Sequence, residues 1–281
     1  MNCPDDIVTN SESCPSADTF AAPLLIAHRG ASRDAPENTL AAFDLAWQQG
    51  ADGIEADFRL TLDGRIVCIH DATTGRTAGV DLVVAESSYA TLQQLDVGSW
   101  QGACWQGERI PTLDEVLARL PADKRLFIEL KSGPEIIAPL ARLLAIEMVP
   151  ARQLRLLAFD SHLLAQLKKQ LPYIKVCLNV DCHRRLPTYN WSPSRVEVLA
   201  VLEQCSADGL SSRANPQLNA TFITSLQQRG KELYVWTVDL ARSAANYNSL
   251  RVDGIMTNRP GWLREKLLPA GSTMAPEGGT R

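Results

Sequence analysis

Acidic and basic side chains lie close together in the stretch GIEADFRLTLDGRIVCIHD. Glu55 and Asp57 are two apart in an apolar run, and His70 follows an Asp63-Gly64 pair. Asp-Gly between β-favouring residues predicts a hairpin. With these two residues as its loop, Asp57 faces His70, and side-chain alternation places Glu55 on the same face. The stretch therefore predicts two carboxylates and an imidazole on one side of a sheet, where they could hold a cation or transfer protons.

Three further segments carry reactive side chains where an apolar run ends. The run LLIA is followed by His28 and Arg29, RLFIELK contains Glu129 and Lys131, and LYVWTV contains Trp236. Each residue alone would usually be an ordinary surface residue. Because the carboxyl ends of parallel strands meet at one rim, we expect these side chains to gather with those of the hairpin.

Short apolar runs alternate with longer segments of helical periodicity along most of the chain. The predicted strands are Leu24–Ala27, Gly53–Phe58, Leu126–Leu130, Leu154–Phe159, Ile174–Leu178, Asp208–Ser211, Leu233–Val238 and Asp253–Met256. Eight strands with intervening helices in about 240 residues predict an α/β fold, a (β/α)8 TIM barrel. A doubly wound sheet is the main alternative, but its glycine-rich first turn is absent after the first strand.

The connection between the second and third barrel strands is too long for a loop. It contains the hairpin and then residues 72–111, which show little periodicity and predict an insertion over the barrel mouth. We expect residues 1–22 to form a mobile arm and residues 269–281 a disordered tail, because both are polar or rich in Gly, Pro, Ser and Thr. Residues 23–268 then form a single domain.

Composition narrows the possible partners. A net charge of −4 in 281 residues offers no basic stripe for nucleic acid. No apolar run approaches the roughly 18 residues that span a bilayer, and the N-terminus has acids where a signal peptide is basic. Seven cysteines fit no zinc pattern. We expect a cytoplasmic protein without stable membrane insertion, either a monomer or a homodimer.

Seven motifs, in order, resemble the glycerophosphodiester phosphodiesterase family, in its bacterial cytoplasmic type. They are HRG at 28–30, PENT at 36–39, GADGIEADFRLTLDG at 50–64, IHD at 69–71, GERIPTLDEVL at 107–117, IELK at 128–131 and VWTV at 235–238. The resemblance covers about Leu24 to Trp262. It implies a barrel enzyme that hydrolyses glycerophosphodiesters, such as glycerophosphocholine or glycerophosphoethanolamine, to sn-glycerol 3-phosphate and an alcohol.

The resemblance also implies roles for the residues at the rim. The two family histidines, general acid and base, match His28 and His70. The metal-binding acids match Glu55, Asp57 and Glu129, an oxygen set suited to Mg²⁺ or Ca²⁺. The phosphate-binding cations match Arg29 and Lys131, and we expect Trp236 to form an apolar wall against glycerol carbons.

Two positions depart from the family pattern. Asn258 stands where an aspartate is common, and Asp239 where an asparagine is common. We expect neither to touch the proposed acid–base pair.

Several alternatives stay open at this stage. A lysophospholipase D-like or phospholipase C-like enzyme would use the same groups on a lipid, and an inactive barrel would only bind phosphorylated ligands. The sequence does not identify the preferred head group, the metal, the acid among the two histidines, or the nucleophile, which is water or the 2-hydroxyl of the substrate.

Overall fold

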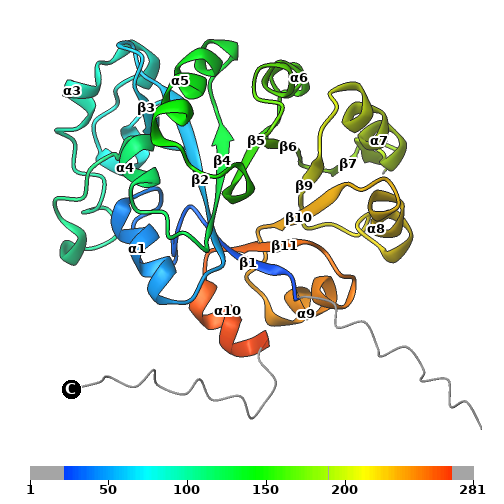
Figure 1. The fold of residues 1–281 in the computed structure, drawn as a ribbon. Helices are drawn as coiled ribbons and strands as arrows, with labels where there is room; N and C mark the ends of the chain where they lie inside the picture. The colour runs from blue at the N-terminus through cyan, green and yellow to red at the C-terminus, as the bar shows by residue number, and fades with distance from the viewer. Residues whose placement is uncertain (1–21, 189, 268–281) are drawn as a thin grey trace, which may run out of the picture.

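A closed barrel of eight parallel strands, with helices on its outside, makes up the body of the protein (Figure 1). The computed structural model describes residues 22–188 and 190–267. Apart from Ala22, the predicted arm and tail lie outside these residues. The predicted (β/α)8 barrel is confirmed, and β1 closes it by pairing with both β2 and β11.

All eight predicted strands are present. The barrel strands are β1 (Leu24–His28), β2 (Gly53–Leu60), β4 (Arg125–Leu130), β5 (Leu154–Ala158), β6 (Lys175–Val180), β9 (Gly209–Arg213), β10 (Glu232–Trp236) and β11 (Gly254–Thr257). The main helices around them are α1 (Leu40–Gln48), α4 (Leu113–Leu117), α5 (Ile137–Glu147), α6 (Ser161–Gln170), α7 (Arg195–Gln204), α8 (Ala220–Gln227), α9 (Ala241–Ser249) and α10 (Pro260–Leu267). Two 3-10 turns, η3 (Pro134–Ile136) and η4 (Ala151–Gln153), flank α5.

Strand alternation divides the core into an outer and an inner part. Outward residues such as Ile54, Ala56 and Phe58 of β2 pack with the surrounding helices. The inward residues of the barrel form a separate cluster: Ile26, Phe127, Leu157, Cys177, Tyr234 and Met256. The next inward position toward the carboxyl end of several strands is polar. The apolar cluster therefore forms the floor of the barrel mouth, and the polar residues above it form the rim.

The hairpin after β2 has a three-residue loop instead of the predicted two. Thr61 N donates to Arg65 O (2.9 Å), which leaves Leu62, Asp63 and Gly64 between the paired residues. Gly64 has φ of 78°. A three-residue hairpin loop needs this left-handed backbone at one position, and glycine adopts it without a steric penalty.

The longer loop shifts the register by one residue, so the predicted pairing of Asp57 with His70 is wrong. Ile69 N, not His70, bonds to Asp57 O (2.9 Å). His70 still reaches the rim because β3 (Ile66–Cys68) ends two residues before it and the chain leaves the ladder. Arg59 Nε then donates to the carbonyl of His70 (2.9 Å) and holds this turn.

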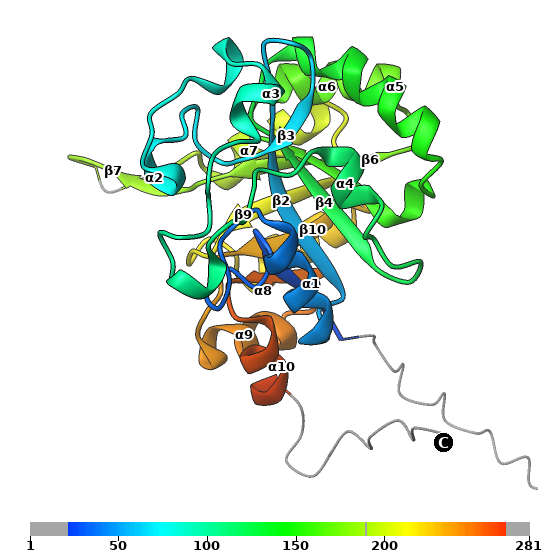
Figure 2. The same cartoon turned by 90° about the vertical axis from the view of Figure 1, so that its left-hand side faces the viewer.

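Residues 72–111 contain four short helical turns: α2 (Gly75–Ala78), η1 (Val84–Glu86), α3 (Tyr89–Leu92) and η2 (Ala103–Trp105). They pack against the hairpin over a small apolar core of Val67, Ile69, Val84, Leu92, Val97 and Ile110. A second excursion, the ribbon of β7 (His183–Arg185) and β8 (Asn190–Ser192), follows β6 and projects from the barrel (Figure 2).

The amino end of the barrel carries an ion pair. Arg155 on β5 donates from Nε and Nη2 to Glu232 on β10 (2.7 and 3.0 Å), and Tyr234 donates its hydroxyl to the same carboxylate (2.9 Å). Arg155 and Glu232 lie one inward position below Leu157 and Tyr234 of the apolar cluster, so this ion pair supports the barrel and is not part of its rim. Within the described residues no helix is long and apolar enough to cross a bilayer.

Candidate active site

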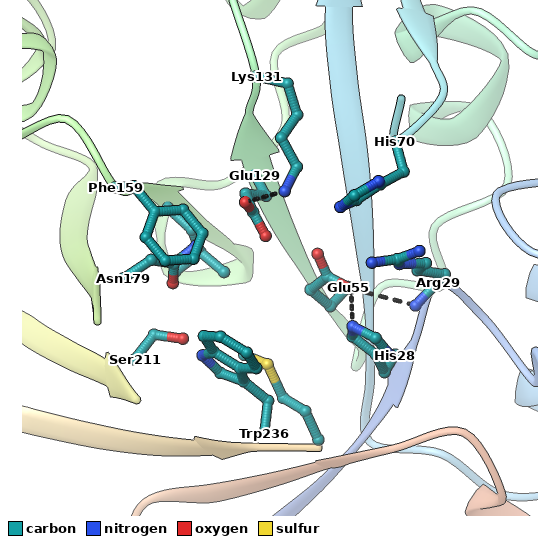
Figure 3. Close-up of a pocket in the computed structure, with 12 residues that line it drawn as sticks. His28, Arg29, Glu55, His70, Glu129, Lys131, Phe159, Asn179, Ser211 and Trp236 are labelled. Carbon is teal, nitrogen blue, oxygen red and sulfur yellow. Dashed lines mark hydrogen bonds and ion pairs between the residues drawn. The ribbon is translucent and has the colours of Figure 1, made fainter. Parts of the chain in front are cut away.

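The polar rim surrounds a cavity of about 210 Å³ at the carboxyl end of the barrel (Figure 3). Its lining residues come from all eight barrel strands and from the segments that follow β1, β3, β4 and β5. They are His28, Arg29, Glu55, His70, Glu129, Lys131, Leu157, Phe159, Asn179, Ser211, Trp236 and Met256. Seven of the eight predicted site residues therefore line one cavity, and the eighth, Asp57, is buried against Arg29 and Lys131.

The end of β1 is shaped by close contact with α1. A Cβ on Gly30 would lie 2.7 Å from the backbone of Ala42, so only glycine allows this approach. Arg29 before it has φ of 57°, which turns its side chain into the site. The backbone N–H of Arg29 donates to Glu55 (3.1 Å), and its guanidinium contacts Asp57 (Nε to Oδ2, 3.1 Å).

Three buried carboxylates form the centre of the site. Oxygens of Glu55, Asp57 and Glu129 lie within 4.8 Å of one another. Lys131 Nζ forms ion pairs with Glu129 and with Asp57 (3.2 Å). Because Asp57 also contacts Arg29, it is the best neutralised of the three acids.

The pKa values follow this distribution of charge. Burial alone would raise the pKa of Asp57, but Arg29 and Lys131 outweigh it and lower the pKa to about 2. Burial, and then the charges of its two neighbouring acids, raise the pKa of Glu55 well above its usual range. Burial, and then the charge of Asp57, also raise the pKa of Glu129. The site thus holds more negative charge than its own cations satisfy.

The donor set fits a hard divalent cation. Glu55 Oε1 is buried and accepts no hydrogen bond, and the buried Asp57 Oδ1 has only its ion pair with Lys131. Carboxylate oxygens are the ligands that Mg²⁺ and Ca²⁺ prefer, and a cation would remove the repulsion that raises the pKa of Glu55 and Glu129. Glu55, Asp57 and Glu129 are therefore the candidate metal ligands.

His28 is held by an amide, which corrects the expectation that Asn258 does not touch the acid–base pair. Its Nδ1 lies 2.8 Å from Asn258 Oδ1. The amide group of Asn258 donates in turn to Asp239 (2.7 Å). Because a carboxylate only accepts, the amide oxygen must face His28 and Nδ1 must carry the proton. Nε2 is then free of hydrogen and faces Glu55 at 4.0 Å.

His70 has a charged partner instead. Its Nδ1 lies 2.6 Å from Asp71 Oδ1. The other oxygen of Asp71 contacts Arg76 on α2, and Arg76 also pairs with Glu37. Part of the insertion thus reaches the rim and fixes the ring of His70, with Nε2 directed toward the cavity (Figure 3).

Asn38, which precedes α1, contacts the buried Asp57 of the site. Thr39 is the N-cap of α1. Asn38 donates from Nδ2 to Asp57 Oδ2 (2.9 Å) and accepts from the backbone N–H of Asp57 (3.1 Å). Glu37 beside it accepts from Arg29 (2.9 Å). Asn38 has a left-handed backbone with φ of 59°, and the sequence alone does not predict this conformation.

The opposite side of the cavity is uncharged. Asn179 on β6, Ser211 on β9 and Trp236 on β10 lie across from His28, Arg29 and His70 (Figure 3). Phe159, after β5, meets Trp236 edge to face with ring centroids 6.0 Å apart. Asn179 and Ser211 were missed, and the available signal was a polar residue at an inward position near the end of an apolar strand.

Known proteins of one family are similar to this chain over nearly all of its described residues. The model of the glycerophosphoryl diester phosphodiesterase family matches residues 28–262. A glycerophosphodiester phosphodiesterase of Caldanaerobacter subterraneus is 35% identical over 243 residues, covering 84% of this chain and 94% of that protein. The Bacillus subtilis protein YhdW is also 35% identical, over 85% of this chain and 96% of its own length.

Solved structures show the same architecture. A phosphodiesterase of Oleispira antarctica in complex with the product sn-glycerol-3-phosphate superposes with a TM-score of 0.76 at 28% identity, covering 87% of this chain and 96% of that one. A glycerophosphodiester phosphodiesterase of Agrobacterium tumefaciens gives a TM-score of 0.74 at 27% identity, with 86% and 99% covered.

Proposed function

Because this chain belongs to the glycerophosphoryl diester phosphodiesterase family and is a phosphodiester hydrolase, we propose that it releases sn-glycerol 3-phosphate from small glycerophosphodiesters by metal-dependent two-histidine catalysis. The observation that carries this proposal is the single cavity in which His28 and His70 flank the acidic triad. The product bound to the Oleispira antarctica enzyme is consistent with it.

Charge neutralisation prepares the phosphate for attack. Arg29 offers paired donors to phosphoryl oxygens and Lys131 a point charge. Glu55, Asp57 and Glu129 would hold Mg²⁺ or Ca²⁺, which would stabilise negative charge on the reacting phosphoryl group. Removing one charge of such a preorganised set typically costs about 3–4 kcal/mol in transition-state stabilisation.

His28 acts as the general base. Its Nδ1–H is occupied by Asn258, so the unprotonated Nε2 faces the cavity and can take a proton from the nucleophile. Burial, and then the neighbouring charge of Arg29, lower the pKa of His28, which keeps the ring neutral. The nucleophile is water or the 2-hydroxyl of the glycerol moiety.

His70 acts as the general acid. Its Nδ1 donates to the carboxylate of Asp71, which orients the ring with Nε2 toward the cavity, as the carboxylate of a catalytic triad does for its imidazole. Its side chain is 33% exposed, against 17% for His28. The more exposed histidine therefore protonates the alcohol that leaves toward solvent.

The remaining assignments concern substrate class and location. The small cavity favours a glycerophosphodiester such as glycerophosphocholine or glycerophosphoethanolamine over a lipid substrate. We place the enzyme in the cytoplasm, as a monomer or homodimer, on the basis of its sequence features.

Metal removal tests the proposal directly. We expect glycerol 3-phosphate release from glycerophosphocholine to stop after chelation and to return with Mg²⁺ or Ca²⁺, while lysophosphatidylcholine is not cleaved under the same conditions. Full activity in the presence of chelator would contradict the metal assignment. Faster cleavage of lysophosphatidylcholine would favour the lipid alternative.

A further inference from the structure

The wall formed by β6, β9 and β10 carries polar atoms that lack hydrogen-bond partners among the described residues. Three such atoms are buried without a partner although their residues line the cavity: Asn179 Oδ1, Ser211 Oγ and Trp236 Nε1. Asn179 and Ser211 are 3% and 0% exposed. Buried polar groups in folded proteins are nearly always hydrogen-bonded, so three unpaired groups on one wall indicate a ligand.

The strand register brings these groups together. Asn179 and Ser211 are in register on the adjacent strands β6 and β9. Tyr234 of β10 is in register with Ser211, and Trp236 is the next residue of β10 on the same face. The three side chains therefore form one patch above the apolar floor, opposite the charged half of the rim (Figure 3).

The donor and acceptor types of this patch match a hydroxyl group. The amide of Asn179 and the hydroxyl of Ser211 can each donate and accept, whereas the indole of Trp236 only donates. A ligand hydroxyl likewise does both. An ammonium group could not accept from the indole, and a phosphate would find no cation on this wall. The rings of Phe159 and Trp236 provide apolar surface for the carbon atoms beside such a hydroxyl.

We propose that Asn179, Ser211 and Trp236 form a subsite for the terminal hydroxyl of the glycerol moiety, the hydroxyl farthest from the phosphate. This assignment rests on the proposed function. It orients the substrate with glycerol toward the neutral wall, phosphate between Arg29 and Lys131, and the second alcohol toward the mouth near His70. An acyl group on the same oxygen would remove the donor and could not fit among these buried side chains.

Two substrates that differ in one hydroxyl test the subsite. Glycerophosphocholine carries the terminal hydroxyl, whereas 2-hydroxypropyl phosphocholine lacks it and keeps the 2-hydroxyl. We expect the wild type to prefer glycerophosphocholine by about tenfold or more in kcat/KM, measured by choline release. Ser211→Ala and Asn179→Leu should each bring this preference down toward one.

Ser212→Ala is the matched control. Ser212 is the next residue on β9, donates to the carbonyl of Arg213 (3.0 Å) and does not line the cavity, so its variant should keep the wild-type preference. Ser211→Ala should also keep the wild-type melting temperature, since the hydroxyl loses no partner in the free enzyme. If the hydroxyl of Ser211 had a structural role, its removal would lower the melting temperature.

The outcomes separate the subsite from the proposed function. If the wild type cleaves both compounds with equal kcat/KM, or if Ser211→Ala and Asn179→Leu keep the wild-type preference, the function stands and the subsite assignment is overturned. If the wild type cleaves neither compound, the proposed function fails, and the subsite fails with it.

Discussion

His28 and His70 have the same side chain but different hydrogen-bond partners, and this difference is the basis of the roles that we propose for them. The partner of His28 is a neutral amide, and the partner of His70 is a carboxylate. A neutral partner fixes the tautomer without stabilising the charged ring, whereas a carboxylate does both. Residue identity alone does not carry this information.

The two roles predict different responses to a good leaving group. We expect His28→Ala and His70→Ala each to lower kcat for glycerophosphocholine at least about 100-fold. With the 4-nitrophenyl ester of glycerol 3-phosphate, whose leaving group needs no proton, His70→Ala should recover most of the lost rate and His28→Ala should not. Release of 4-nitrophenol measures this.

Circular dichroism of both variants controls for folding. A histidine variant with near wild-type turnover of glycerophosphocholine would contradict its catalytic assignment. Recovery by His28→Ala instead of His70→Ala would reverse the roles of base and acid.

Hydrogen bonds between segments far apart in the sequence are what sequence reasoning misses at this site. His28 and Asn258 are 230 positions apart and meet only because β11 closes the barrel against β1. Asn258 and Asp239 were noticed as departures from the family pattern, but their hydrogen bond and its link to His28 required the fold. By contrast, Glu55 and Asp57 share a face by alternation along one strand, which the sequence predicts directly.

At the scale of elements, burial decides what the sequence reveals. The barrel strands are buried along most of their length and most of them are rich in apolar residues, and all eight were predicted. In α7 only Val198 and Leu202 are buried, and β7 is exposed along its length, so neither has a clear apolar period. The hairpin register was wrong because an Asp-Gly pair occurs in loops of both two and three residues.

The insertion depends on one close contact, which gives a prediction for its stability. A Cβ on Gly98 would lie 1.9 Å from the carbonyl oxygen of Trp105, whereas a Cβ on Gly102 would meet nothing closer than 3.7 Å. We expect Gly98→Ala to lower the free energy of unfolding by about 1–3 kcal/mol, the usual cost of forcing atoms into a packed region.

Gly102→Ala in the same segment is the control and should stay within about 0.5 kcal/mol of the wild type. Urea unfolding of the two variants provides the measurement. Equal stability of both variants would mean that the backbone around Gly98 moves freely enough to accept a methyl group.

At the scale of the whole molecule, the two ends of the barrel use charge differently. The rim gathers acids whose repulsion is left for a cation to relieve, and the amino end pairs its charges within the protein. Arg155 and Glu232 form a two-pronged contact. Function and stability are thereby separated along the barrel axis, which lets rim residues change without loss of the fold.

The amino-end pair makes stability depend on pH in a defined direction. Burial alone would raise the pKa of Glu232, but its hydrogen bonds and ion pairs with Arg155 and Lys175 outweigh burial and lower the pKa. A carboxyl with a lowered folded pKa contributes stability above its unfolded pKa of about 4.3 and loses it as the pH falls through the folded value.

We therefore expect Glu232→Gln to lower the melting temperature at neutral pH, because it leaves the guanidinium of Arg155 without its counter-charge. The difference in melting temperature between wild type and variant should become smaller below about pH 4, as the wild-type carboxylate takes up its proton. Thermal unfolding followed by circular dichroism between about pH 7 and pH 3 measures this difference in melting temperature.

Glu203→Gln on the exposed side of α7 is the control and should have nearly the wild-type melting temperature at any pH. If the melting temperature of Glu232→Gln stayed below that of the wild type by a constant amount across this range, the ionised pair of Arg155 and Glu232 would not stabilise the barrel.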